Sequence, residues 1–196
     1  MLTEQSVLLM GVCLLAGYAF GNFLTADIVA RCLAGVGVRS LGNGRPSAEN
    51  ISAVLGKAAG AAVLAGDVLK TLAACWFCYR LAAPELGEQA VLYGGVGLVL
   101  GQVWPLRFRG RGAPPAAVIC AWLVVYLPIT GSLCALAGAV VAFGTGDRPL
   151  GAMLIPLLAA PVAWMQFGPL SAALILAVAL LQWAQYKRKR NFPKRR

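Results

Sequence analysis

Histidine is absent from the sequence, and charged residues are scarce. Only 12% of the 196 residues are Asp, Glu, Lys or Arg, whereas about a quarter of a typical soluble domain is charged. Hydrophobic residues make up 60% of the chain, and its mean hydropathy is +0.76. This composition leaves too little polar surface to cover a water-soluble globule. It therefore excludes an ordinary soluble domain and indicates a single membrane-embedded bundle with short loops.

The lack of histidine also limits metal chemistry. Two of the six cysteines, Cys75 and Cys78, form a CxxC pair, which in a soluble protein suggests a metal or redox site. This pair lies inside an apolar run, with no second pair and no histidine to complete a ligand set. We expect ordinary packing cysteines, and neither a metal site nor a cofactor.

Acidic residues are also few. The chain has 7 of them against 17 Lys and Arg, which gives a net charge of +10, and seven of its last ten residues are basic. Each cationic residue beside a membrane is attracted to anionic head groups by about 1 kcal/mol. Nucleic-acid recognition usually requires a folded domain with interleaved aromatic residues, which these charges lack. We expect the tail at 187–196 to face membrane lipids, and no nucleic acid as a partner.

Long apolar runs occupy most of the chain. A helix needs about 20 predominantly apolar residues to span a membrane. Runs of about that length or longer fall at about 6–28, 51–82, 89–106, 113–144 and 150–186. The first run follows Met-Leu-Thr-Glu, without the basic segment of a signal peptide, so we expect it to be retained as a span.

The last two runs are too long for one span each at about 1.5 Å per residue. Pro128 with Gly131 can break the earlier run, and Phe167-Gly168-Pro169 can break the later one. Each run then becomes a helical pair. The predicted fold is an all-α integral membrane protein with about seven transmembrane helices. It comprises a single bundle over 1–186 and a basic cytoplasmic tail over 187–196.

Positive charge predicts the orientation, because cytoplasmic loops carry an excess of Lys and Arg. Seven spans with the N-terminus outside place the tail in the cytoplasm together with Arg39, Arg45, Arg107, Arg109, Arg111 and Arg148. The outside loops then hold Glu4, Glu85 and Glu88. A five-span alternative, in which each long run crosses once, also keeps the tail inside but puts Arg148 outside. Seven spans are therefore favoured.

This topology brings three segments rich in Arg, Lys, Asn and Gly to one face: loop 39–50, hinge 107–112 and tail 186–196. Glycines let backbone N–H groups turn toward an anion, and arginine supplies a fork that suits phosphate. The pattern indicates a cytoplasmic membrane-surface site for a phosphorylated substrate. Topogenic charge alone would explain the cations, but not Gly42-Asn43-Gly44 followed by Asn50.

Two ionisable residues, Asp67 and Lys70, lie one helical turn apart inside the second apolar run. Ionisable groups at mid-membrane cost about 2.5–3.5 kcal/mol each on insertion scales, so they usually pair or line a polar cavity. At this spacing they can pair with each other, and they either act on a ligand or brace the site. Asp27 and Arg31, at i,i+4, are interpreted as a structural pair.

An ordered set of motifs runs along the chain. It begins with Gly21 and continues through GVGVRSLGNGRPSAEN at 35–50, Leu55-Gly56, Gly60, Asp67-Val-Leu-Lys70, Gly101-Gln-Val-Trp-Pro105, Arg107-Phe-Arg-Gly110 and Tyr186-Lys-Arg-Lys-Arg-Asn191. This order and spacing resembles the bacterial acyl-phosphate:glycerol-3-phosphate acyltransferases, the PlsY family. That family has GS-x-P, GVDIR…GSGNxGATN, LG…D-x-x-K, GHxFP, KFKGGK and YRHRxN. The resemblance covers nearly the whole chain.

The resemblance implies a multi-pass enzyme of the bacterial plasma membrane that acts in phospholipid biosynthesis. An acyl phosphate dissolved in the bilayer would donate its chain to the 1-hydroxyl of glycerol 3-phosphate, giving lysophosphatidic acid. An acyl phosphate is a mixed anhydride with a good leaving group. The protein must therefore mainly bind two phosphates, orient the hydroxyl and stabilise the oxyanion.

The chain departs from the family motifs at several positions. The family's Ser in GSGN is Asn43 here, its following Asn is Arg45, and the His of GHxFP is Gln102. The Gly and Thr of GATN are Ser47 and Glu49, and the tail His is Arg188. Any base must then be Glu49, Asp67 or a phosphate oxygen of the donor.

Two alternatives follow from these departures: a divergent acyltransferase, or a catalytically degenerate paralogue that binds phosphorylated lipid or regulates an acyltransferase partner. The first is favoured because Asn50, Lys70 and Asn191 are kept together with a strongly basic face. A solute transporter is a weaker third alternative, because no paired broken helices in symmetric halves are evident.

The resemblance assigns roles to twelve positions of this chain. Residues predicted to orient the acceptor or take part in catalysis are Asn43, Ser47, Asn50, Gln102 and Asn191. Residues predicted to bind substrate phosphate are Gly42, Gly44, Arg45, Lys70, Arg107, Arg109 and Arg111.

Overall fold

The computed structural model describes residues 4–108 and 112–191, with side chains described as far as Lys187. All regular structure in these residues is helical. The α-helices are α1 (Glu4–Gly21), α2 (Thr25–Ala34), α3 (Ala48–Leu55), α4 (Lys57–Leu86), α5 (Gln89–Val103), α6 (Ala116–Tyr126), α7 (Pro128–Thr145), α8 (Arg148–Phe167) and α9 (Pro169–Asn191). Two 3₁₀ turns, η1 (Val38–Ser40) and η2 (Leu106–Phe108), lie in the loops.

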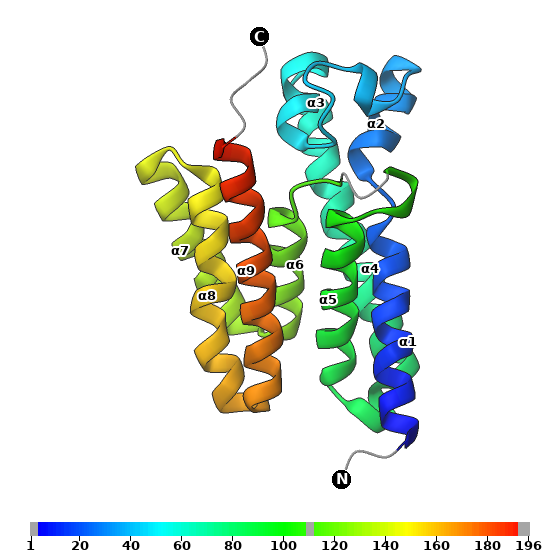
Figure 1. Cartoon of the computed structure of the whole chain (residues 1–196), viewed down its shortest axis with the longest axis vertical. Coiled ribbons are helices and arrows are strands. Elements are labelled where there is room, and N and C mark those ends of the chain that lie inside the picture. Colours follow the sequence, from blue (N-terminus) through cyan, green and yellow to red (C-terminus); the bar gives the residue numbers. More distant parts are fainter. Residues whose placement is uncertain (1–3, 109–111, 192–196) are drawn as a thin grey trace. The chain divides into compact units, whose positions relative to one another are not determined.

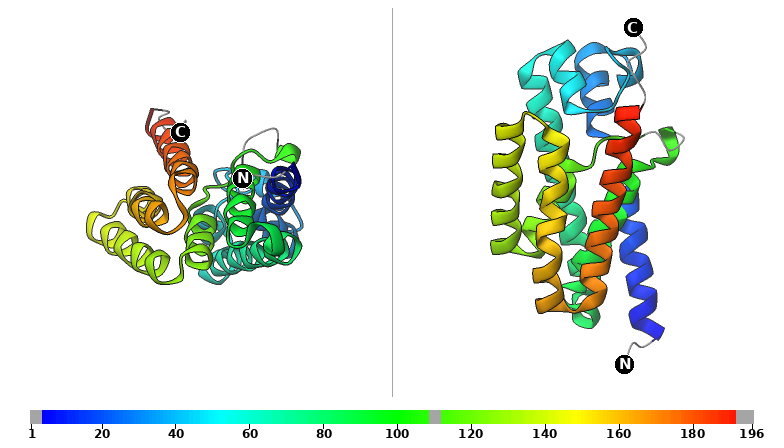
Figure 2. Two further views of the ribbon diagram at one scale, coloured as in Figure 1. Left: turned by 90° about the horizontal axis from the view of Figure 1, so that it is seen from below. Right: turned by 60° about the vertical axis from the view of Figure 1, so that its left-hand side comes forward.

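The chain divides into two units, Met1–Trp122 and Leu123–Arg196, and the boundary falls within α6. In the first unit, α1, α4 and α5 pack along one another, while α2 and α3 lie beyond one end of these helices (Figure 1). In the second unit, α8 packs against both α7 and α9 (Figure 2). The all-helical prediction is confirmed for the described residues.

Glycines allow α1 and α5 to approach closely. A Cβ added at Gly17 would overlap the carbonyl group of Gly94, and one added at Gly101 would overlap the carbonyl oxygen of Tyr18. Such close packing is typical of membrane proteins, in which small residues let helix backbones approach each other and gain van der Waals contact. The contacts run in the same order along both helices, from Gly17 with Gly94 to Gly21 with Gly101, so α1 and α5 run parallel. Their C-terminal ends meet on the side of α2 and α3.

In the described part of the chain, five helical segments are long and apolar enough, by length and composition, to cross a membrane: Glu4–Ala34, Lys57–Leu86, Pro128–Thr145, Arg148–Phe167 and Pro169–Lys187. The helix α6 is shorter, with 11 residues. These segments support a membrane protein, and the count of seven spans stays a prediction.

Both long apolar runs break where the prolines and glycines predict. The first break leaves Leu127 outside helical geometry, with φ −130° and ψ 77°, between α6 and the proline that begins α7. The second break is Gly168, with a left-handed φ of +90°, between α8 and α9. Pro128 has no backbone N–H, so it cannot make the hydrogen bond that would continue the preceding helix. Gly168 adopts its positive φ without steric cost.

Two earlier apolar runs contain turns that were not predicted. The expected span at about 6–28 ends at Gly21, and a separate helix begins at Thr25. The expected segment at about 51–82 is divided by Gly56, whose φ of +94° ends α3 before α4 begins. Hydropathy counts apolar side chains and takes no account of a backbone turn made by a small residue, so both turns were missed.

In the second unit, α8 and α9 are joined near the basic tail by a side-chain contact. Asp147 caps the start of α8, where its Oδ1 accepts from the N–H of Leu150, and its Oδ2 accepts from the hydroxyl of Tyr186 at 2.8 Å. The ammonium of Lys187 lies 4.2 Å from the ring centroid of Trp183. The Tyr186 bond fixes this turn of α9 against the α7–α8 loop, while the Lys187 contact with Trp183 lies within α9.

Candidate functional site

Loop 39–50 is organised by the buried side chain of Asn50. Its Nδ2 donates to the carbonyl oxygens of Leu41 and Arg45, both at 3.0 Å, and its Oδ1 accepts from the N–H of Asn43 at 3.0 Å. Ser47 caps α3, because its Oγ accepts from the N–H of Asn50 at 3.2 Å. Both amide donors of Asn50 are thus used inside the loop, and this residue determines the shape of the loop.

The two predicted glycines of this loop have left-handed backbones, with φ of +52° at Gly42 and +69° at Gly44. A Cβ at Gly42 would also overlap the Asn50 amide. The N–H of Gly44 donates to Leu41 at 2.9 Å, and that of Arg45 to the Asn43 side chain at 3.0 Å. These N–H groups are therefore occupied within the loop, whereas the side chain of Arg45 is exposed and can reach an anion.

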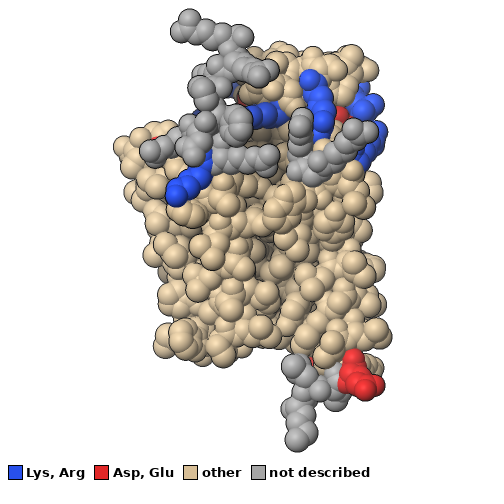
Figure 3. Space-filling view, in the orientation of Figure 1, with Lys and Arg blue, Asp and Glu red and all other residues tan. Residues whose placement is uncertain are grey.

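The described start of the hinge, residues 107 and 108, lies against loop 39–50. The Nη2 of Arg39 donates to the carbonyl oxygen of Phe108 at 2.7 Å, and the Arg39 guanidinium lies 5.0 Å from the centroid of the Phe108 ring. Phe108 belongs to one buried hydrophobic cluster with Val38 and Ile51, on either side of the loop. Since Arg107 is exposed beside this contact, the loop and the start of the hinge present their cations at the same end of the first unit (Figure 3).

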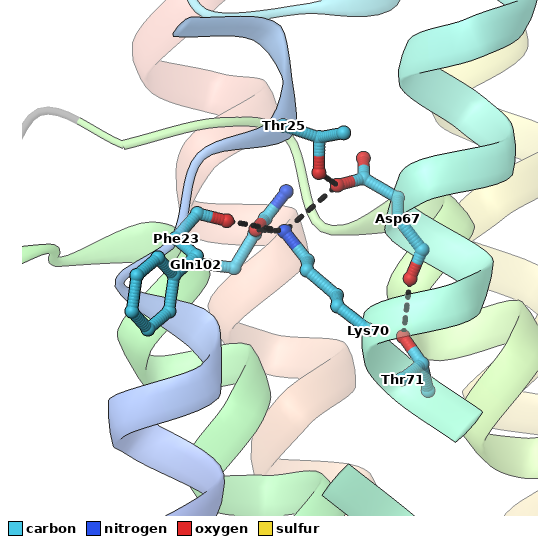
Figure 4. A network of polar contacts seen from close by, with 6 residues as sticks. All are labelled: Phe23, Thr25, Asp67, Lys70, Thr71 and Gln102. Carbon is cyan, nitrogen blue, oxygen red and sulfur yellow. Dashed lines mark hydrogen bonds and ion pairs between the residues drawn. The ribbon is translucent and has the colours of Figure 1, made fainter. Parts of the chain in front are cut away.

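A buried polar network lies below this end, centred on Lys70 (Figure 4). Its ammonium pairs with Asp67 at 2.7 Å, donates to the carbonyl oxygen of Phe23 at 3.0 Å and contacts Oε1 of Gln102. Thr25 donates its hydroxyl to Asp67 at 2.7 Å. A lysine ammonium has three N–H donors, and this set accounts for all of them.

The network joins three separate parts of the first unit: helix α4, the turn between α1 and α2, and the end of α5. The predicted pairing of Asp67 with Lys70 is observed. Of the two roles left open for this pair, the geometry favours bracing. Asp27 and Arg31 also pair as predicted, at 2.9 Å, and Asp27 accepts in addition from the N–H of Val38.

Two side chains near the end of α1, Tyr18 and Asn22, contact the segment that leads into the hinge, and sequence reasoning missed both. The hydroxyl of Tyr18 donates to the carbonyl oxygen of Trp104 at 2.8 Å, and Oδ1 of Asn22 accepts from the N–H of Leu106 at 2.7 Å. A polar Asn directly after Gly21, at the end of an apolar run, was the available signal.

The remaining predicted residues cannot be placed beside this site. Arg109 and Arg111 lie outside the described residues. Asn191 ends α9 in the second unit, and its side chain also lies outside the described part. Convergence of the tail with the loop and hinge stays a prediction. Among the described residues no group of three or more His, Cys, Asp or Glu could hold a metal ion.

Comparison with known proteins gives consistent matches over most of the chain. The family model described as glycerol-3-phosphate acyltransferase matches residues 11–194. A glycerol-3-phosphate acyltransferase of Neisseria gonorrhoeae is 31% identical over 173 residues, covering 87% of this chain and 86% of that protein. One from Lactobacillus acidophilus is 36% identical over 112 residues, covering 57% and 53%.

A solved structure shares the fold. The crystal structure of PlsY, an integral membrane glycerol 3-phosphate acyltransferase, in its glycerol 3-phosphate form superposes with a TM-score of 0.77. The match covers 93% of this chain and 90% of that one, at 19% identity. At this identity the likeness shows the fold alone.

Proposed function

The chain belongs to the glycerol-3-phosphate acyltransferase family, and we propose that it transfers an acyl chain from an acyl phosphate to glycerol 3-phosphate. The 1-hydroxyl oxygen of the acceptor forms an ester bond with the acyl carbon, and the bond from that carbon to the phosphate oxygen breaks. The hydroxyl proton leaves with the inorganic phosphate. The products are lysophosphatidic acid and phosphate, and the substrates and surrounding membrane lipids are the expected partners.

The observation that carries this proposal is the attachment of two cationic segments to each other at one end of the first unit. Arg39 bonds the backbone of the hinge, and the exposed side chains of Arg45 and Arg107 lie on the two segments so joined. Acyl transfer from a mixed anhydride needs no strong protein nucleophile. It needs anion binding and orientation, which fixed arginines supply.

The individual roles are proposals. Arg45, Arg107, Arg109 and Arg111 bind the substrate phosphates, and Asn191 joins them from the tail. Gly42, Gly44 and Asn50 give the loop its shape, while Asn43 and Ser47 orient the acceptor. The Ser47 oxygen accepts from a backbone N–H, which leaves its hydroxyl proton for donation. Lys70 and Gln102 brace the site from below, and a donor phosphate oxygen takes the proton.

We also propose seven spans in a bacterial plasma membrane, with the N-terminus outside and the tail in the cytoplasm. The charge distribution of the first unit supports this orientation. Glu4 begins α1, and Glu85 and Glu88 flank the α4–α5 turn, at the end opposite to the loop and hinge. An excess of Lys and Arg marks the cytoplasmic side of a membrane protein.

The test is an assay of purified protein with palmitoyl phosphate and glycerol 3-phosphate, measuring released phosphate and lysophosphatidic acid. We expect phosphate release to depend on the acceptor. Arg45→Ala and Arg107→Ala should each raise the KM for glycerol 3-phosphate about tenfold, since a hydrogen bond to a charged group contributes about 1.5–3 kcal/mol.

Arg80→Ala is the matched control, because Arg80 is exposed on α4 toward the acidic end of the first unit. It should leave the KM unchanged. Bound phosphorylated lipid with no acyl transfer would contradict the proposed reaction and favour the degenerate paralogue. Solute flux in liposomes without acyl transfer would favour a transporter.

A further inference from the structure

The hinge is part of a loop that is closed at its neck by backbone hydrogen bonds. The N–H of Gly112 donates to the carbonyl oxygen of Val103 at 3.1 Å, and that of Ala113 to Gln102 at 2.9 Å. The loop therefore leaves the end of α5 and returns to it. A closed neck fixes where the loop starts and ends, but it does not fix the direction in which residues 104–108 run.

Three side chains from outside the loop bind the backbone of that stretch. They come from residues far away in the sequence: Tyr18 donates to Trp104, Asn22 accepts from Leu106, and Arg39 donates to Phe108. The three distances are 2.8, 2.7 and 2.7 Å. Because each bond is made to a main-chain atom, together they fix the path of the backbone on both sides of Arg107.

The clamp made by Tyr18, Asn22 and Arg39 is attached to rigid parts of the first unit. Asn22 donates its Nδ2 to the carbonyl oxygen of Tyr18 at 2.8 Å, so its amide is held in one orientation. Both residues lie at the end of α1 that is locked to α5 by backbone contact at Gly21. Arg39 is held by its stacking on Phe108.

We propose that Tyr18, Asn22 and Arg39 are positioning residues that hold Arg107 toward the anionic substrate. The inference rests on the proposed function, because it assigns Arg107 a substrate phosphate. A displaced Arg107 would bind the substrate phosphate less well, because a hydrogen bond to a charged group contributes about 1.5–3 kcal/mol only when its geometry is kept. Arg39 thereby acquires a specific task, because one guanidinium both donates to the Phe108 carbonyl oxygen and lies over the Phe108 ring, a combination that the compact ammonium of lysine matches less well.

The sharpest test compares two variants of one residue. Asn22→Asp keeps the acceptor for the Leu106 N–H and loses only the donor to Tyr18, whereas Asn22→Ala removes both. Hydrogen exchange at Leu106 should be about tenfold faster in Asn22→Ala than in Asn22→Asp, with the increase confined to peptides within 104–108. Tyr18→Phe and Arg39→Lys should also accelerate exchange there. Tyr79→Phe, on the exposed surface of α4, should not.

Kinetics then separates positioning from a purely structural role. Asn22→Ala should raise the KM for glycerol 3-phosphate about tenfold while kcat changes by less than about twofold, and Asn22→Asp should raise the KM less than Asn22→Ala does. Loss of folded protein would instead lower kcat and the melting temperature and leave KM unchanged. Unchanged local exchange, or faster exchange with an unchanged KM, would overturn the proposal, as would faster exchange throughout the first unit.

Failure of the proposed function would look different. If the unsubstituted protein shows no acceptor-dependent acyl transfer, the proposed reaction is wrong. Hydrogen exchange at residues 104–108 still tests whether Tyr18, Asn22 and Arg39 hold the loop. Calorimetric binding of glycerol 3-phosphate then replaces KM as the second measurement. Weaker binding by Asn22→Ala than by Asn22→Asp supports the positioning role, and equal binding refutes it.

Discussion

The buried network around Lys70 shows what one residue's environment adds to a sequence pattern. The i,i+3 spacing predicts the pair with Asp67 because both residues lie on one helix face. The contacts with Phe23 and Gln102 lie 47 and 32 residues away in the chain, and no local pattern indicates them. With all three ammonium donors engaged inside the protein, the contacts of Lys70 favour a bracing role, and the phosphate-binding role assigned to it stays a prediction.

Removing one member of this pair should be costlier than removing both. Lys70→Met leaves the Asp67 carboxylate buried without its counter-ion, and loss of one partner of a buried pair typically costs about 3–5 kcal/mol. The double variant Asp67→Asn/Lys70→Met removes both charges, so it should be more stable than Lys70→Met alone. Thermal unfolding in detergent measures the difference. A double variant less stable than Lys70→Met would contradict the pairing.

At the scale of helices, the sequence predicts a break where a proline accompanies it and misses a break where none does. Proline and glycine at 128 and 168 give a backbone reason for a break, and both breaks are present. The turn after Gly21 and the turn at Gly56 have no such proline, so both remained hidden within apolar runs. Tertiary contacts accompany both turns. At the first turn the Asn22 side chain accepts from the N–H of Leu106, and at the second α3 packs on α4.

The close contact between α1 and α5 makes a direct prediction for two glycines of the same helix. Gly17→Ala places a Cβ against the backbone of Gly94 and should destabilise the protein by about 1–3 kcal/mol, as overpacking does. At Gly11 no atom lies within 4 Å of an added Cβ. Gly11→Ala should therefore be neutral or stabilising by up to about 1 kcal/mol, because Ala favours the helix.

Melting temperatures of the two variants in one detergent check this prediction. The substitution is the same and so is the helix, which removes helix propensity from the comparison. Equal melting temperatures would mean that α1 and α5 are not in backbone contact at Gly17.

For the whole molecule, charge placement was the most useful signal in the sequence. It predicts that loop 39–50 and hinge 107–112 lie on one face, and Arg39 on Phe108 brings them together. It does not predict Tyr18 or Asn22, because a contact between a side chain and a distant backbone atom has no sequence pattern. The roles of Arg109, Arg111 and Asn191 stay predictions.

The span count can be tested through the loop between α7 and α8, where the seven-span and five-span topologies disagree. Helices α7, α8 and α9 are each long enough to cross alone, whereas the 11 residues of α6 span about 16 Å of a core about 30 Å thick. If α6 did not cross while α1, α4, α5, α7, α8 and α9 did, the tail would emerge on the same side as the N-terminus. The sidedness of the α7–α8 loop and of the tail therefore decides the count.

An epitope inserted between Thr145 and Gly146 leaves the Asp147 cap of α8 intact and probes this loop. In spheroplasts we expect antibody to reach it, and a second epitope at the C-terminus, only after permeabilisation. A third epitope in the α4–α5 turn at Gly87 should be reached without permeabilisation. Five spans instead expose the Thr145 epitope on intact spheroplasts and keep the C-terminal epitope hidden. An exposed C-terminal epitope would contradict both topologies and place the tail away from loop 39–50, which would remove Asn191 from the proposed site.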